Sequence, residues 1–324
     1  MKLLVTGGAG YVGSVVASQL VEAGHETVVL DDLSKGHEDA VPGGARLARG
    51  SLLDGAFVTR TLAGGFDGVL HFAALSLVAE SVEEPERYYR NNVGGTLNLL
   101  DAMVGAGVGR LVFSSTAAVY GEPERVPIPE TDPSAPTNPY GNSKLAVDRM
   151  IGDVARARGL SATSLRYFNV AGASGRFGED HEPETHLIPI VLQAAAGTRG
   201  SVKVFGTDYP TRDGTAVRDY IHIEDLGRAH LLALEASEPG RHRIYNLGNG
   251  SGFSVLEVIE AARKVTGADI RAVEAPRRAG DPPELVASSD AIRADLGWRP
   301  EKPGVEAMIS DAWAWMLDHP RGYE

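Results

Sequence analysis

The chain has 324 residues, 43% of them hydrophobic, and its 31 Lys and Arg against 43 Asp and Glu give a net charge of −12. This acidic balance argues against nucleic acid or an anionic membrane as the partner, because both attract a broad basic surface. The lack of cysteine excludes disulfides, thiol catalysis and zinc–thiolate sites.

The N-terminal apolar run stops after Val5, which is too early for a signal peptide. No stretch approaches the ~20 apolar residues of a membrane-spanning helix. We therefore expect a cytoplasmic enzyme with no membrane partner.

The first half of the chain alternates short apolar runs with helical patterns. Apolar residues recur at the spacing of one helix face within 12–20, around 88–104 and within 147–154, and strands are expected at 2–6, 27–30, 69–73, 110–114 and 160–167. Such alternation predicts a parallel sheet with helices on both faces, as in the doubly wound Rossmann fold.

Glycine, proline and charged residues become frequent after about residue 170. We therefore predict an α/β protein with a Rossmann domain over 1–170 and a smaller C-terminal α/β domain over 171–324. An apolar segment near 241–248 is expected to return to the first domain as a strand.

A glycine-rich segment, Gly7-Gly8-Ala9-Gly10-Tyr11-Val12-Gly13, joins the first strand to the first helix. Glycines permit a tight turn and let backbone N–H groups and the helix dipole approach a pyrophosphate. Asp31 ends the second strand eighteen positions past Gly13, where a carboxylate can hold an adenosine ribose. Asp31 and Asp32 would repel a 2′-phosphate, so the segment predicts NAD rather than NADP.

Tyr140 and Lys144 are four residues apart, which places both side chains on one helix face. A phenol is a poor base at neutral pH, but a nearby ammonium, together with the positive nicotinamide ring, stabilises the phenolate and lowers its pKa. Ser114, Ser115 and Thr116 end a predicted strand, and ligands bind at the carboxyl ends of such strands. Together these residues predict a catalytic site that oxidises a carbinol.

The sequence resembles the extended short-chain dehydrogenase/reductase family over essentially its whole length, and within it the sugar-nucleotide 4-epimerases. The general motifs are TGGAGYVG (6–13), HFAA (71–74), YYRNNVGGT (88–96), FSSTAAVYG (113–121), YGNSK (140–144) and RYFNVAGA (166–173). The most specific are FGTDYPTRDGTAVRDYIHIEDL (205–226) and RRAGD (277–281).

This resemblance implies reversible C4 epimerisation of UDP-galactose and UDP-glucose through a 4-keto sugar, with tightly bound NAD transiently reduced. Tyr140 would be the base, Lys144 would tune it and hold the nicotinamide ribose, and Thr116 would guide the proton. The first domain would bind NAD and the second the UDP-hexose.

The resemblance also assigns binding residues. The NAD contacts would come from Gly7, Gly10, Tyr11, Val12, Gly13, Asp31, Ser51, Leu52, Phe72, Ala73, Ala74, Asn91, Ser114, Tyr140, Lys144 and Tyr167. The substrate contacts would come from Thr116, Asn169, His186, Leu187, Phe205, Arg218, Arg278, Asp281 and Leu285. No metal site is expected. A homodimer is implied, and it would pair helices that carry Val93, Leu97, Leu100 and Met103.

Some positions depart from the family pattern. Ser51 replaces an Asp that contacts adenine, and Ser76 replaces a Lys near the cofactor. His186 replaces an Asn, and a neutral imidazole there can still donate to phosphate. Leu285 is intermediate between the bulky residue that excludes an N-acetyl group and the small one that admits it.

Other functions compete with this interpretation. A 4-epimerase of UDP-GlcNAc, UDP-xylose or UDP-glucuronate would differ only in the sugar pocket. A 4,6-dehydratase of this fold carries Asp-Glu after the threonine, whereas Ala117 and Ala118 follow it here. A non-catalytic NAD-binding regulator would not require Tyr140 and Lys144.

Overall fold

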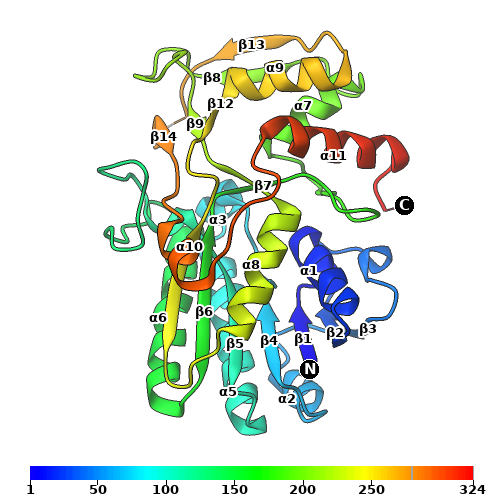
Figure 1. Cartoon of the computed structure of the whole chain (residues 1–324), viewed down its shortest axis with the longest axis vertical. Helices are drawn as coiled ribbons and strands as arrows, with labels where there is room; N and C mark the ends of the chain where they lie inside the picture. The colour runs from blue at the N-terminus through cyan, green and yellow to red at the C-terminus, as the bar shows by residue number, and fades with distance from the viewer. Residues whose placement is uncertain (279, 324) are drawn as a thin grey trace.

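A seven-stranded parallel sheet forms the centre of the molecule, in the order β11-β6-β5-β4-β1-β2-β3. The computed structural model describes residues 1–278 and 280–323 (Figure 1). The strands are β1 (Lys2–Thr6), β2 (Glu26–Asp31), β3 (Arg46–Arg49), β4 (Gly68–His71), β5 (Arg110–Thr116), β6 (Ser161–Tyr167) and β11 (His242–Leu247). Their carboxyl ends all point toward the C-terminal part of the chain (Figure 1).

Helices cover both faces of the sheet. On one face, α2 (Gly55–Leu62), α5 (Gly95–Ala106) and α6 (Pro139–Arg158) pack into a core with β4 and β5. On the other face, α1 (Tyr11–Glu22), α8 (Ile223–Glu235) and α10 (Asp290–Leu296) pack into a separate core against the same sheet. The predicted doubly wound fold is therefore confirmed. Leu100 and Met103, which were expected at a subunit interface, lie inside the first of these cores, because α5 turns them toward the sheet.

Short helical turns connect the elements at the carboxyl edge of the sheet. They are η1 (Glu38–Ala40), α3 (Val78–Glu83), α4 (Pro85–Tyr88), the π-helical turn η2 (Tyr89–Gly94) and η3 (Ala117–Val119). The helix expected around 88–104 is present, because α4, η2 and α5 follow one another with helical backbone angles and η2 is a π-helical segment within that helix.

The C-terminal part of the chain builds a second core above the sheet (Figure 1). It contains α7 (Leu187–Ala195), α9 (Val255–Thr266) and α11 (Val305–Asp318). Small sheets join β8 (Val202–Phe205) to β13 (Ala272–Ala275), β7 (Asn169–Ala171) to β10 (Tyr220–His222), and β9 (Val217–Arg218) to β12 (Phe253–Ser254) and β14 (Glu284–Leu285).

Three elements from beyond residue 170 pack with the first domain. β11 pairs in parallel with β6, while α8 and α10 lie in the core beside β1. The domain boundary at residue 170 stays a prediction. In the structure, α8 and α10 pack with the first domain together with the returning strand β11. Among the helices in the described part of the chain, none combines the length and apolar character needed to cross a bilayer.

Candidate active site

The turn between β1 and α1 is closed by contacts that only glycine permits. Gly7 has a φ of +72°, and a Cβ on it would lie 2.5 Å from the Ala73 backbone nitrogen. A Cβ on Gly13 would lie 2.1 Å from the Gly7 carbonyl oxygen. The α1 N-cap is Gly10, which offers no side-chain hydrogen bond, and the first turn of the helix carries no acidic residue. The first backbone N–H groups of α1 are therefore suited to an anionic ligand such as a pyrophosphate.

Asp31 holds this turn in place. One of its carboxylate oxygens accepts the Ala9 N–H at 3.0 Å and the other accepts the Leu33 N–H at 2.9 Å. Burial raises the pKa of Asp31, and these two hydrogen bonds partly oppose that shift. The carboxylate predicted to bind a ribose therefore also organises the loop around that ribose site.

Gly13→Ala is expected to weaken NAD binding by about tenfold or more, equivalent to roughly 1.4 kcal/mol of binding free energy, and so to lower the amount of NAD that copurifies with the protein. The added methyl group must push the Gly7 carbonyl out of the turn. Absorbance and enzymatic assay of NAD released from denatured protein would measure the loss. Gly105→Ala is the matched control, because a Cβ there meets nothing within 4 Å. Equal NAD content in the two variants would contradict the assignment of the turn.

The predicted NAD-binding residues occupy the ends of neighbouring strands. Ser51 and Leu52 follow β3, Asp31 ends β2, Phe72 and Ala73 follow β4, Ser114 lies in β5, and Tyr167 ends β6. The Tyr167 hydroxyl bonds the Ser114 hydroxyl across the two strands. Asn91 lies in η2, where its side chain donates to Asn92 at 3.1 Å. Asn92, which the sequence did not single out, is buried and ties Leu75 to Ser143 of α6.

Tyr140 and Lys144 stand on the first turns of α6, beside the end of β5. The helix begins there because the Asn138 side chain accepts the Gly141 N–H at 2.9 Å and Pro139 occupies the first helical turn. Tyr140 hydrogen-bonds Thr116. The Lys144 ammonium donates to the Ser114 carbonyl at 2.8 Å and lies 4.7 Å from the centre of the Phe113 ring. The structure thus brings the predicted catalytic residues together.

The electrostatics of this pair differ from the expected lowering of the Tyr140 pKa by Lys144. Burial raises the pKa of Tyr140, and the hydrogen bond with Thr116 partly opposes it. Burial also lowers the pKa of Lys144 to about 8, although the nearby negative charge of Asp148 acts to raise that pKa. In the protein alone, therefore, the phenol is protonated at neutral pH, because desolvation of the phenolate outweighs the stabilising contacts.

A buried ion pair lies behind these residues. Asp148, one turn beyond Lys144, accepts two hydrogen bonds from Arg166, at 3.1 and 3.0 Å, and one from Ser115 at 3.1 Å. Arg166 in turn donates to the Tyr120 hydroxyl at 3.0 Å. Sequence reasoning missed this network. A signal was present, since Asp148 continues the four-residue spacing of Tyr140 and Lys144 on an otherwise apolar helix face.

Two of the predicted substrate residues, Arg278 and Asp281, line one cavity, and each contacts a further predicted residue. The Arg278 guanidinium lies 4.0 Å from the centre of the Phe205 ring, and Arg218 forms an ion pair with Asp281. The cavity has a volume of about 490 Å³ and lies between the 122–123 loop and residues 209–210, 277–278 and 280–283. The site combines two guanidinium groups with an aromatic face, which suits a phosphorylated aromatic base.

The remaining predicted substrate residues lie elsewhere. The Asn169 side chain donates to the Asp219 carbonyl at 3.0 Å, Leu187 packs against the second core, and Leu285 packs beside Tyr120. His186 is not the neutral imidazole expected. Burial opposes its charge, but Glu179 and Glu184 outweigh that effect and raise its pKa to about 10.

Comparisons with known proteins extend these observations. A sequence model of the NAD-dependent epimerase/dehydratase family matches residues 3–248. The UDP-glucose 4-epimerase of Streptomyces lividans is 59% identical over 325 residues, covering 100% of this chain and 98% of that relative.

Solved structures agree. A crystal structure of a UDP-glucose 4-epimerase superposes with a TM-score of 0.97 at 48% identity, covering 100% of both chains. That of UDP-glucose 4-epimerase from Bifidobacterium longum in complex with NAD⁺ and UDP has a TM-score of 0.94 at 37% identity, covering 99% of this chain and 100% of the other.

Proposed function

The chain belongs to the NAD-dependent epimerase/dehydratase family, and from that premise we propose that it is an isomerase of galactose metabolism that interconverts UDP-galactose and UDP-glucose by inverting C4. The observation that carries the proposal is the placement of Tyr140, Thr116 and Lys144 at the carboxyl edge of the sheet, in a chain similar to UDP-glucose 4-epimerases along its whole length.

The residues at the β1–α1 turn fit NAD, since Gly7 and Gly13 keep the turn open to backbone contact and the Asp31 carboxylate lies at the turn, where it would accept from the ribose. When bound, oxidised NAD supplies a hydride acceptor for the sugar carbon and a positive ring charge near the phenol. Tyr140, as the phenolate that this charge and Lys144 would favour, would take the proton of the sugar hydroxyl, and Thr116 beside it would guide that proton. Lys144 sets the local charge from a buried position.

Inversion requires that UDP stays bound while the 4-keto sugar turns to present its other face. Arg218 and Arg278 provide forked, charge-assisted donors for the diphosphate. Phe205 offers its ring to the uracil, and Asp281 accepts from the uridine ribose. The ion pair between Arg218 and Asp281 keeps the residue that binds the diphosphate next to the residue that binds the ribose.

A single incubation tests this function. Purified protein is mixed with UDP-galactose and no added NAD, and the products are separated by chromatography. We expect UDP-glucose, because the cofactor is regenerated in each cycle and stays bound. UDP-GlcNAc, UDP-xylose and UDP-glucuronate are run in parallel. Turnover of one of these with none of UDP-galactose would assign the chain to a different 4-epimerase, and no turnover of any would favour a non-catalytic role.

We propose that the protein is a homodimer paired through α5 and α6. Leu97 and Val104 on α5 are 46% and 40% exposed, and Met150 on the neighbouring α6 is half-buried, so an apolar strip faces outward there. Two copies pairing across a two-fold axis would bury it.

Leu97→Glu is expected to shift the protein from dimer to monomer in analytical ultracentrifugation, because it places a charge in the centre of that strip. Leu317→Glu changes a leucine that is 58% exposed on α11 and should leave the mass unchanged. A wild-type mass equal to one chain would exclude the dimer.

A further inference from the structure

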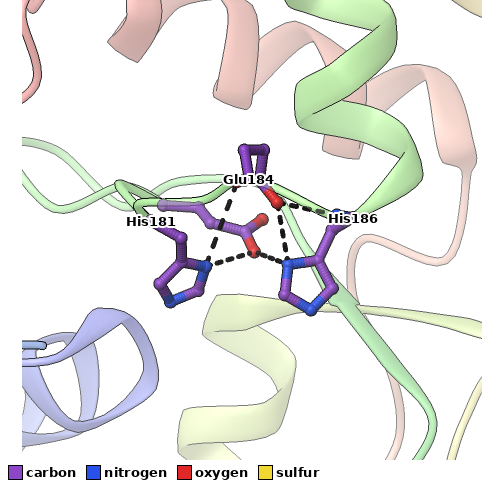
Figure 2. Close-up of side chains that lie close together, drawn as sticks. His181, Glu184 and His186 are labelled. Atoms are coloured by element: carbon purple, nitrogen blue, oxygen red, sulfur yellow. Dashed lines mark hydrogen bonds and ion pairs between the residues drawn. The ribbon is translucent and has the colours of Figure 1, made fainter. Parts of the chain in front are cut away.

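Four side chains with metal-binding atoms converge just before α7 (Figure 2). The Nδ1 atom of His186 lies 2.8 Å from a Glu179 carboxylate oxygen and 3.0 Å from one of Glu184. The Nδ1 atom of His181 lies 3.1 Å from Glu179 and 4.0 Å from Glu184. One ligand atom from each of the four residues lies within 4.8 Å of the others.

We propose that Glu179, His181, Glu184 and His186 bind a zinc ion. Zinc prefers four ligands at about 2.0–2.2 Å in a tetrahedron, so neighbouring ligand atoms are about 3.3 Å apart. The four distances above, between 2.8 and 4.0 Å, lie on both sides of that value. Two imidazoles with two carboxylates suit zinc, whereas magnesium and calcium prefer oxygen alone.

The burial of the two carboxylates, beside histidines whose side chains are 31% and 48% exposed, points to a ligand independently of the spacing of the four residues. The Glu179 and Glu184 side chains are only 9% and 6% exposed, so two carboxylates are brought together away from water. The buried Nδ1 atom of His181 makes no acceptable hydrogen bond among the described residues. A divalent cation would balance both carboxylates and give this atom a partner, and it would replace the proton on His186.

The position of the cluster gives the ion a role. The segment that carries it lies against the dinucleotide turn: His181 meets Tyr11 edge-on at 6.5 Å, and Lys35 donates to the Glu182 carbonyl at 2.9 Å. A metal at Nδ1 of His186 also leaves the proton on Nε2, so this ring becomes a fixed donor. The ion would thus tie the segment to α7 between the proposed NAD and diphosphate sites.

The proposed zinc site is tested by metal binding rather than by turnover, so the result of the test is independent of the proposed epimerase activity. The full chain is stripped with a chelator, titrated with Zn²⁺ at pH 7.5 in a calorimeter, and assayed for bound metal by mass spectrometry. We expect one zinc per chain and a higher melting temperature with the metal. Co²⁺ in place of Zn²⁺ should give the intense visible absorption of tetrahedral cobalt.

His181→Ala and Glu184→Gln should each weaken zinc binding by at least about 100-fold, since even outer-shell changes cost 10–100-fold. Glu184→Gln keeps an oxygen for the Thr185 and His186 N–H groups and so guards against misfolding. His25→Ala removes a histidine far from the cluster and is the matched control. No stoichiometric zinc, or equal affinity in all variants, would overturn the proposal and identify the cluster as a protonated ion-pair network. The proposal departs from the sequence-based expectation of no metal.

Discussion

Tyr140→Phe is expected to lower the turnover of UDP-galactose by about 10²- to 10⁴-fold, the usual contribution of a positioned acid–base group. The phenol is half-buried and hydrogen-bonded to Thr116, so its loss removes the proton acceptor without opening a cavity. Because the diphosphate and uracil would be held by Arg218, Arg278 and Phe205 and not by Tyr140, UDP affinity should stay within a few-fold of wild type.

The variant is measured by steady-state kinetics and by calorimetric titration with UDP. Tyr245→Phe is the matched control, because the Tyr245 hydroxyl bonds Asp295 of α10 and not Tyr140 or Lys144. Its turnover should match that of wild type. Retention of more than about a tenth of the wild-type turnover in Tyr140→Phe would assign the base to another group and remove the basis of the mechanism.

The sheet could be predicted where a buried strand carries mainly apolar residues. The run at 2–6 corresponds to β1, because buried parallel strands need apolar side chains on both faces. The run at 160–167 corresponds to β6, although Ser164 and Arg166 are among its buried residues. β3 was missed, since Arg46-Leu-Ala-Arg49 lies at the sheet edge and has charged residues at both ends. The strand expected at 69–73 ends at His71, because the Phe72 and Ala73 N–H groups both turn to the Thr6 carbonyl.

The residues of the candidate site also differ in whether the sequence could predict them. Gly7, Tyr140 and Lys144 were predictable because their function depends on local spacing along one turn or one helix. The Asp148–Arg166 pair depends on a contact between α6 and β6, and His186 depends on how the loop before α7 folds. Asp148 itself continues the four-residue spacing of Tyr140 and Lys144, but its partner Arg166 and the surroundings of His186 leave no periodic signal. Burial, which raises the pKa of Tyr140 in the protein alone, also depends on the packed structure and not on the spacing of two residues. The lowering expected from Lys144 together with the nicotinamide ring stays a prediction.

Asp148→Ala is expected to lower the free energy of unfolding by about 3–5 kcal/mol, the cost of leaving one member of a buried ion pair without its partner. The Asp148 and Arg166 side chains are 2% and 4% exposed, so water cannot replace the lost carboxylate. Chemical denaturation monitored by circular dichroism would measure the change. Asp153→Ala on the same helix is the matched control, because Asp153 and its partner Arg156 are 74% and 71% exposed and such pairs contribute only about 0.2–1 kcal/mol.

A double replacement separates the stability of this pair from its effect on the site. Asp148→Leu with Arg166→Met removes both charges and keeps the volume apolar, so stability should recover to near wild type or above it. Turnover should remain low, because Asp148 raises the pKa of Lys144 and Ser115 loses its acceptor beside Thr116. Full recovery of turnover with stability would mean that the pair serves only the fold. A stable Asp148→Ala variant would instead show that Arg166 finds another anion or reaches solvent.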